Sequence, residues 1–208
     1  MKRFFNNRFQ KAAMFGLDAR IALAVFAALS TITGVALYSA IRQAKAVSLL
    51  SDMREVGKAW EQYYLDTGQD LPHVDPDPVA DAYYSYELAK LVEDPGFFGW
   101  KGPYLPYPKQ VEYRLTHTEL EEIFLIILTN AETWGGAISY QIGYCKAGKN
   151  CSVWVRFSDF DLDEKWILEK IDVMVDAGDG AAKGSFRWHD NTTDYRSFLR
   201  YAPIKDRA

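Results

Sequence analysis

The longest uninterrupted apolar stretch of the chain runs from Ile21 to Ile41, which is 21 residues without a charged side chain. A helix of that length rises about 30 Å, the thickness of the hydrocarbon core of a bilayer. The pattern therefore predicts one membrane-spanning helix. The next most apolar run, Ile123 to Leu128, has only six residues, so a channel or transporter with several spans is excluded.

The apolar pattern changes beyond this run but does not stop. From Val47 to Tyr64, apolar residues recur every three or four positions, with charged residues between them. This spacing is typical of an amphipathic helix, and no proline separates the two segments. The residues Asp66 to Gly68 are expected to end the helix, because glycine suits a C-terminal cap. The sequence thus predicts one helix from about residue 18 to residue 65, roughly 72 Å long.

Beyond residue 65 the apolar patterns are shorter, and they predict a small head that contains both helices and strands. Proline-rich and glycine-rich stretches indicate loops, and short runs of apolar spacing indicate brief helices and strands. The predicted elements are a loop over residues 66–80, a short helix over 81–93, a packed but irregular connector over 95–108, a helix over 161–175 and a strand over 185–188.

In the middle of the head, one segment fits either a helix or a strand. Thr118 and Glu121 have the spacing of a capping box that would open a helix over residues 123–128, but six apolar residues fit a buried strand equally well. Residues 138–144 and 151–157 alternate between apolar and polar positions and predict a β-hairpin. We therefore expect an α+β chain in which one long helix packs on a small antiparallel sheet.

The two cysteines, Cys145 and Cys151, lie at the inner ends of the predicted hairpin. In an oxidising compartment they could form a structural disulfide. Two free thiols or a metal pair are the alternatives. Zinc is disfavoured, because no matching cluster of His or Cys occurs elsewhere in the sequence.

Charge divides the chain into a short basic N-terminal segment and an acidic remainder. Lys2, Arg3, Arg8 and Lys11 precede Asp18, the first acidic residue, and without these four positive charges the net charge falls from −4 to −8. Positively charged flanks of a membrane span stay in the cytoplasm, so the chain beyond the span is expected outside the cytoplasmic membrane. The sequence has no large basic patch, and nucleic acid is not an expected partner.

Catalytic chemistry is not indicated. The sequence lacks nucleophile-elbow, phosphate-loop, dinucleotide and zinc-protease motifs, and its three histidines are scattered, so we expect a protein that is not an enzyme and has no cofactor. Asp176 and Asp179 offer carboxylates in a glycine-containing loop that could bind calcium. The loop lacks the ligand spacing of an EF-hand, and such carboxylates more often cap backbone amides in a turn.

The plan of basic leader, membrane helix, amphipathic helix and small α+β head resembles the type IV pilin and pseudopilin superfamily. Three stretches carry this resemblance. The segment 99–105, GWKGPYL, is similar to the GW-x-GPYL stretch of major pseudopilins of type II secretion. The segment 170–180, followed by Gly184 and Arg187, is similar to the late K-x-D…D-D-G-x…T-G-x-x-R pattern of pilins. The third stretch is the junction KAAMFGLD at 11–18.

At this junction the resemblance implies that a prepilin peptidase removes a basic leader and that the new N-terminus is methylated. The family is usually cut after Gly. A cut after Gly16 makes Leu17 the first mature residue, whereas a cut after Ala13 makes Met14 the first. The sequence does not decide between these two cut positions. The chain departs from the family pattern in either case, so an uncleaved relative is an alternative.

The fifth mature residue of the family is usually Glu, which satisfies the free amine of a neighbouring N-terminus inside the lipid-embedded filament. A cut after Ala13 places Asp18 at this position, and a cut after Gly16 places Ile21 there. Asp18 has a simpler interpretation as an acid that favours a helix N-terminus. Arg20 is expected to pair with Asp18 or to reach the lipid headgroups.

By resemblance, the chain is expected to be a structural subunit that assembles through its N-terminal helix into a type IV pilus or a type II secretion pseudopilus. The implied partners are copies of itself, other pilin-like subunits, the peptidase, a motor ATPase and a platform protein of the bacterial inner membrane. The head would lie in the periplasm or on an extracellular filament. The alternative is a membrane-anchored periplasmic binding or scaffold protein that does not polymerise. The expected parts are a leader (1–16), a long helix (17–65, membrane span 21–41) and a head (66–208).

Overall fold

The structure is a computed structural model that describes residues 6–75, 77, 81–146 and 148–204. Side chains are described for Gly16 and from residue 18 onward, except at positions 81 and 82. The chain falls into two compact units, Met1–Ala44 and Lys45–Ala208, which are treated separately below. We refer to the second unit as the head.

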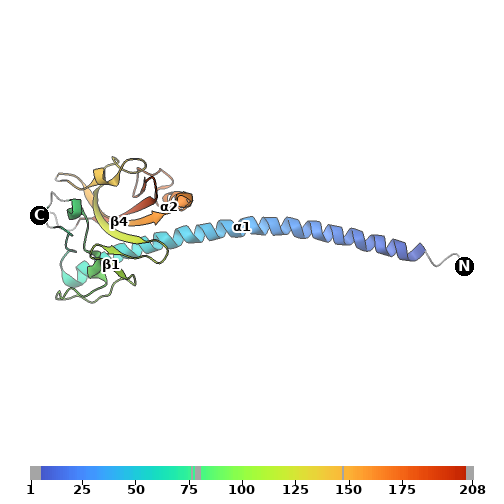
Figure 1. Ribbon diagram of the computed structural model, residues 1–208, viewed down its shortest axis with the longest axis horizontal. Coiled ribbons are helices and arrows are strands. Elements are labelled where there is room, and N and C mark those ends of the chain that lie inside the picture. The colour runs from blue at the N-terminus through green and yellow to red at the C-terminus, as the bar shows by residue number, and fades with distance from the viewer. Residues whose placement is uncertain (1–5, 76, 78–80, 147, 205–208) are drawn as a thin grey trace. The chain divides into compact units, whose positions relative to one another are not determined.

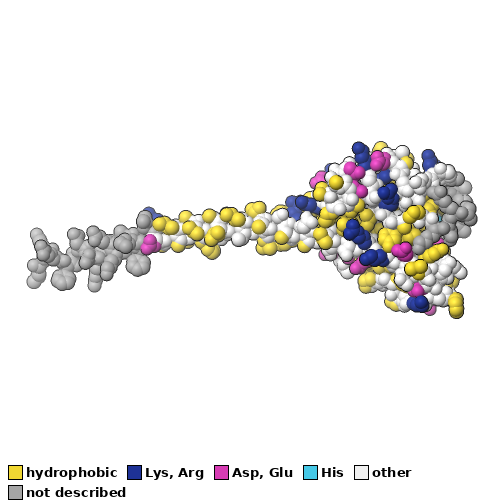
Figure 2. All heavy atoms as spheres, turned by 180° about the vertical axis from the view of Figure 1, so that it is seen from behind, with side chains coloured by type: hydrophobic (Ala, Val, Ile, Leu, Met, Phe, Trp, Pro, Cys, Tyr) yellow, Lys and Arg dark blue, Asp and Glu magenta, His cyan; other side chains and the backbone are white. Residues whose placement is uncertain are grey.

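Helix α1 runs from Asn6 to Thr67 and begins about twelve residues earlier than predicted. Residues 6–17 contain no proline, and their lysine, glutamine and alanine residues are good helix formers, so the helix has no reason to start at Asp18. In the first unit every side chain from 18 to 41 is exposed, and Figure 2 shows apolar side chains along this part of α1. Asp18–Thr67 is the one helix in the described residues that is long and apolar enough to cross a membrane.

The end of α1 lies in the head and follows the prediction. Gly68 adopts φ +70°, and its amide donates a hydrogen bond of 2.8 Å to the carbonyl of Tyr64. The hydroxyl of Thr67 donates to the carbonyl of Tyr63, so two of the last free carbonyls of the helix are satisfied. Glycine is required here because other residues rarely adopt a positive φ.

A stripe along α1 supplies one side of the core of the head. These residues recur with helical spacing and are at most 5% exposed: Ala46, Leu49, Leu50, Met53, Val56, Ala59, Trp60 and Tyr63. The predicted amphipathic segment is thus confirmed, although Val47, which we placed on its apolar side, is 48% exposed. Because this stripe belongs to the core, the second compact unit begins at Lys45 and not at the end of the helix.

The head contains a six-stranded antiparallel sheet with the strand order β1-β2-β3-β4-β6-β5. Figure 1 shows the sheet beside the C-terminal part of α1 and beside α2. The predicted α+β fold, a long helix packed on an antiparallel sheet, is confirmed and is consistent with a pilin-like fold. The strands are β1 (Lys109–Val111), β2 (Arg114–Leu115), β3 (Glu122–Thr129), β4 (Cys151–Phe160), β5 (Phe186–Asp190) and β6 (Tyr195–Pro203), and helix α2 is Lys165–Asp176.

Both faces of the central strands β3 and β4 are buried, which explains why the apolar run of β3 does not alternate. On one face, Leu125 and Val155 pack in the main core with the α1 stripe and with α2. On the other face, Ile126 and Trp154 form a second, largely aromatic cluster. The loop 130–150 covers this second face with aromatic side chains. A strand buried on two faces reads as a continuous apolar run.

The open choice for residues 123–128 is settled by the structure as strand β3, and the predicted capping box at Thr118 and Glu121 is wrong. His117 caps the turn instead, because its Nδ1 atom accepts hydrogen bonds from the amides of Glu119 and Leu120 at 3.1 and 3.2 Å. The run then pairs continuously with β4, in agreement with the strand propensity of its isoleucine and phenylalanine residues.

The predicted hairpin is wrong in its first strand. Residues 138–144 include a short 3-10 helix, Tyr140–Gly143, and β4 forms its hairpin with β3 instead. The alternation at 138–144 does not mark one buried face, because Ile138 and Ile142 are exposed while Tyr140 packs on the second face of the sheet. The predicted helix over 81–93 is likewise replaced by two short 3-10 helices, Asp81–Tyr84 and Leu88–Leu91.

Between these two turns the chain pairs with the sheet. Ser85 forms an isolated bridge with Ile126, and the amide of Tyr86 donates to the carbonyl of Leu125 at 3.0 Å. This pairing interrupts the helical spacing. Two further predictions for the head are confirmed more closely: the helix predicted over 161–175 is a short 3-10 turn, Leu162–Glu164, followed by α2, and β5 overlaps the strand predicted over 185–188.

Candidate functional site

The apolar part of α1 is the first candidate site, because an exposed apolar helical surface of this length is suited to contact lipid or other helices. The hydroxyl of Thr31 donates to the carbonyl of Ala28, and that of Thr33 to the carbonyl of Leu29, at 2.8 and 2.9 Å. Both threonines therefore satisfy their polar groups within the helix, as an apolar surrounding requires. Gly34 leaves open space, since a Cβ there would have no neighbour within 4 Å.

The predicted processing residues lie at the start of this segment. Gly16 is exposed, whereas the side chains of Ala13, Met14 and Leu17 lie outside the described residues. Asp18 and Arg20 are both exposed on α1. Residues two positions apart on a helix do not face each other, so an Asp18–Arg20 pair within one chain is disfavoured. Both side chains are instead available to lipid headgroups or to another chain.

The segment 99–105, one of the three that carry the family resemblance, closes over the end of α1. Gly99 adopts φ +90°, and a Cβ at this position would overlap the carbonyl of Asp66. The Asp66 carboxylate accepts hydrogen bonds from the Lys101 ammonium at 3.0 Å and from the Tyr104 hydroxyl at 3.2 Å. The hydrogen bond from Lys101 lowers the pKa of Asp66. These contacts give the segment a structural role that the sequence pattern does not reveal.

The late glycine–aspartate pattern forms a compact turn after α2. Asp176 accepts hydrogen bonds from the backbone amides of Ser185 and Phe186 at 2.8 and 2.6 Å. A Cβ at Gly184 would overlap the Asp176 carboxylate, and Gly184 adopts φ +69°, so this position requires glycine. The turn thereby sets the start of β5, in agreement with the capping role expected for such carboxylates.

Arg187, the last residue of the pattern, joins β5 to the loop 130–150. Its guanidinium donates to the carbonyls of Ala131 at 2.8 Å and Asn130 at 3.0 Å. The same group lies 4.7 Å from the ring centre of Trp134 and 5.2 Å from that of Trp154. The side chain is 1% exposed, and this burial lowers the pKa of the guanidinium. Arg187 therefore holds the beginning of the loop against the second face of the sheet.

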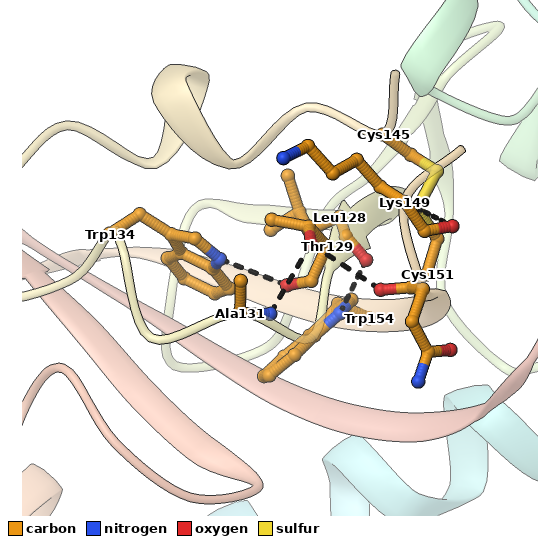
Figure 3. Close-up of a disulfide and its surroundings, with 9 residues drawn as sticks. Leu128, Thr129, Ala131, Trp134, Cys145, Lys149, Cys151 and Trp154 are labelled. Carbon is orange, nitrogen blue, oxygen red and sulfur yellow. Dashed lines mark hydrogen bonds between the residues drawn. A yellow bond between two sulfur atoms is a disulfide. The ribbon is translucent and has the colours of Figure 1, made fainter. Parts of the chain in front are cut away.

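The disulfide between Cys145 and Cys151 holds the other end of the loop, so the prediction of a disulfide is confirmed. Figure 3 shows the disulfide together with Trp134 and Trp154. Their indole groups donate to the carbonyls of Thr129 and Leu128 at 3.1 and 3.2 Å. The arginine, the disulfide and the two indoles together fasten the loop to the sheet.

Reducing the disulfide is expected to lower the free energy of unfolding by about 2 kcal/mol, because a short closed loop constrains the unfolded chain. Urea unfolding of the detergent-solubilised chain, with and without dithiothreitol, measures this difference. A chain with both cysteines replaced by serine is the control and should not respond to the reductant. Equal stability of the reduced and oxidised wild-type chain would contradict the structural role of the bond.

Asp172, Asp176 and Asp179 are the residues that could hold a cation. One carboxylate oxygen from each lies within 4.8 Å of the others. Asp172 is 3% exposed, and its Oδ1 atom has no hydrogen-bond partner, while Oδ2 accepts from the amide of Gly180 at 3.0 Å. Burial raises the pKa of Asp172, and the neighbouring charges of Asp179 and Asp176 add to the shift. Asp176 already serves two backbone amides.

The raised pKa of Asp172 makes a prediction about pH. The folded chain binds this proton more tightly than the unfolded chain, so ionised Asp172 costs stability above its pKa, and the cost disappears as pH falls toward the ordinary aspartate range. Asp172→Asn is therefore expected to stabilise the head at pH 7 in EDTA but not in acid.

Thermal unfolding between pH 3 and pH 8 tests this expectation. Asp179→Asn is the matched control at an exposed position and should change stability less. A variant Asp172→Asn that is less stable than wild type at pH 7 in EDTA would show that the carboxylate charge is needed. Added calcium tests the cation expectation separately, since a bound cation would stabilise the wild-type chain more than Asp172→Asn.

Comparison of the chain with protein-family models, with curated proteins and with solved structures finds no match.

Proposed function

We propose that this protein is a structural, pilin-like subunit that assembles through α1 into a filament of the type IV pilus or type II secretion pseudopilus class. The observation that supports this proposal most is that α1 combines an exposed apolar segment with a segment that packs in the core. Its segment 18–41 exposes every side chain, and its segment 46–63 provides the core stripe of an α+β head. A purely soluble protein would not leave an apolar helical surface of this length uncovered.

In this proposal, the apolar segment resides in the bacterial inner membrane before assembly. Lipid tails and neighbouring helices are both apolar, so the same surface suits a bilayer and the centre of a fibre. The head, outside the membrane, coats the fibre. A cytoplasmic motor ATPase and an inner-membrane platform protein supply the energy and the template for transfer, and other pilin-like subunits join the filament.

Asp18 has a specific role in this proposal. When a peptidase cuts after Ala13, the new amine of one subunit pairs with the Asp18 carboxylate of its neighbour, so two charges are satisfied in an apolar surrounding. A matched pair of variants separates charge from shape. Asp18→Ala is expected to lower the amount of filament at least about tenfold, whereas Asp18→Glu, which keeps the charge, is expected to assemble.

Mass spectrometry of the N-terminus of the protein from its host tests processing directly. A mature N-terminus at Met14 or Leu17 supports the pilin-like proposal. An intact Met1, together with an Asp18→Ala chain that behaves as wild type, would contradict it and favour a membrane-anchored scaffold or binding protein.

A further inference from the structure

His117 is a buried histidine that joins the turn before β3 to helix α1. Its side chain is 2% exposed, and its Nδ1 atom accepts hydrogen bonds from the amides of Glu119 and Leu120 at 3.1 and 3.2 Å. At the other edge of the ring, the Nε2 atom lies 3.4 Å from a carboxylate oxygen of Asp52 on α1. These contacts place one titratable ring between two backbone donors and one acid.

The two backbone amides determine which nitrogen of the ring carries the proton. An amide N–H can only donate, so Nδ1 must be the unprotonated, accepting nitrogen of a neutral imidazole. The single ring proton is then on Nε2, at the edge that faces Asp52. The closed turn is compatible only with the neutral ring, because an imidazolium carries a proton on both nitrogens.

Proton uptake by the ring opposes the closed turn. The second proton must go to Nδ1, where it would face two N–H donors, so both hydrogen bonds are lost and both amides lose their acceptor. The same proton turns the contact between Nε2–H and Asp52 into a charged pair. Protonation therefore weakens the contact of the ring with the turn and strengthens its contact with α1.

Three elements pack against the ring. Helix α1 supplies Asp52, the connector 95–108 supplies Tyr107 with its ring centre 5.3 Å away, and β4 supplies Phe157 at 5.0 Å. Burial, together with the charges of Asp52 and Glu55, raises the pKa of Tyr107 to about 12, so this phenol stays neutral where histidine titrates. The side chain of Glu119, in the turn itself, is exposed. Among these groups the imidazole is the one that changes charge between pH 5 and pH 8.

The turn also determines the position of a core residue. It connects β2 to β3, and the amide of Thr116 at its start donates to the carbonyl of Pro108 at 2.9 Å. Leu120 at its end is 5% exposed and belongs to the main core. Opening of the turn would therefore expose Leu120 and release the chain that leads into β3.

We propose that His117 is a proton-sensitive latch of the head. The neutral ring closes the turn 117–120, and proton uptake at Nδ1 opens the turn and leaves the imidazolium paired with Asp52. A histidine of this kind responds between pH 5 and pH 8. The latch lies within the head and does not depend on how α1 assembles, so it goes beyond the proposed function. A head outside the cytoplasmic membrane, as proposed above, would meet the pH of its surroundings directly.

Nitrogen NMR of the detergent-solubilised full chain, with isotopically labelled histidine, tests the closed state. At pH 8 we expect His117 to carry its proton on Nε2. His73 is the internal control, because its Nδ1 atom lies 2.7 Å from the carbonyl of Tyr83 and must donate to it. It should therefore show the opposite tautomer. A His117 ring with its proton on Nδ1 at pH 8 would overturn the proposal.

Hydrogen exchange of the backbone amides measures the opening. In the wild-type chain, the protection factors of the amides of Glu119 and Leu120 are expected to fall at least about tenfold from pH 8 to pH 5. His117→Asn keeps an accepting oxygen near the place of Nδ1 but takes up no proton, so its turn should stay protected at both pH values. His117→Leu has no acceptor and should be unprotected at both. Wild-type protection that is the same at pH 8 and pH 5 would overturn the latch.

The variant Asp52→Asn tests the partner acid. It removes the charge that stabilises the open, protonated state, so we expect the midpoint of opening to move to lower pH by about one pH unit. Glu55→Gln, which removes an exposed acid three residues further along α1, is the matched control and should move the midpoint less. An unchanged midpoint in Asp52→Asn would overturn the pairing on which the latch depends. None of these outcomes affects the proposed function, since filament assembly is not the measured quantity.

Discussion

Arg187→Ala is expected to lower the free energy of unfolding of the head by about 3–5 kcal/mol. The substitution leaves the carbonyls of Asn130 and Ala131 without their buried donors. It also removes the cation that lies against Trp134 and Trp154. Removing the guanidinium also removes the free-energy cost of burying it. This gain is smaller than the losses, because the buried guanidinium of Arg187 is compensated by hydrogen bonds and ring contacts.

Urea unfolding followed by tryptophan fluorescence measures this effect in the detergent-solubilised chain. Arg187→Lys is expected to recover less than half of the loss, since an ammonium does not reproduce the fork of two donors. Arg200→Ala, which removes a nearby arginine bonded to the Ser185 hydroxyl, is the matched control and should cost about 1 kcal/mol. A loss no larger than this control at Arg187 would show that the loop is held by other contacts.

Gly57→Ala is expected to destabilise the head by about 1–3 kcal/mol, although alanine is the better helix former. A Cβ at position 57 would overlap the ring of Tyr201, which packs against α1 there and lies 6.2 Å from the ring centre of Trp60. The Tyr201 hydroxyl also donates to Glu61 at 3.1 Å. Relief of the overlap would therefore displace Tyr201 from β6 or bend the helix.

The effect of Gly57→Ala on stability should change sign when the ring of Tyr201 is removed. In a Tyr201→Ala background, Gly57→Ala is expected to stabilise the head by up to about 1 kcal/mol, because only the helix propensity remains. Chemical unfolding of the four chains completes this double-mutant cycle. A stabilising effect of Gly57→Ala in the wild-type background would contradict the packing described for α1 and β6.

The long helix could be predicted from the sequence because its signals are local and long. The apolar run and the heptad-like stripe need no knowledge of the rest of the chain. The end of α1 at Gly68 was equally predictable, since the cap depends on one residue's backbone freedom. The early start at Asn6 was not, because the sequence before Asp18 holds no signal that separates a leader from a helix.

The sheet was harder to predict because its partners are distant in sequence. The run 123–128 is a strand only because it pairs with β4 and is covered on both faces. Residues 138–144 alternate like a strand, yet they form part of a loop that covers the sheet. Strand β6 escaped prediction, since its mixture of arginine, tyrosine and serine has no clean alternation.

In the candidate sites, too, features that depend on local sequence could be predicted, and those that depend on distant contacts could not. The cysteine pair and the aspartate turn could be found from residue type and spacing, but the part played by Arg187 depends on a loop more than fifty residues away. Asp66 was expected only to end a helix, and the structure makes it the anchor of the segment 99–105. The exposure of Phe98 could not be read from an aromatic-rich connector that is otherwise well packed.

Assembly through the apolar segment of α1 is the central claim, and the recovery of filaments tests it most directly. Filaments sheared from the host are counted by electron microscopy with an antibody against the head, for wild type, Gly34→Ala and Gly34→Leu. We predict labelled filaments for wild type and the small substitution. For Gly34→Leu, which fills open space on the helix, we predict at least about a tenfold loss at an unchanged amount in the membrane. A protein that stays monomeric in the membrane, with all three chains alike, would contradict the account.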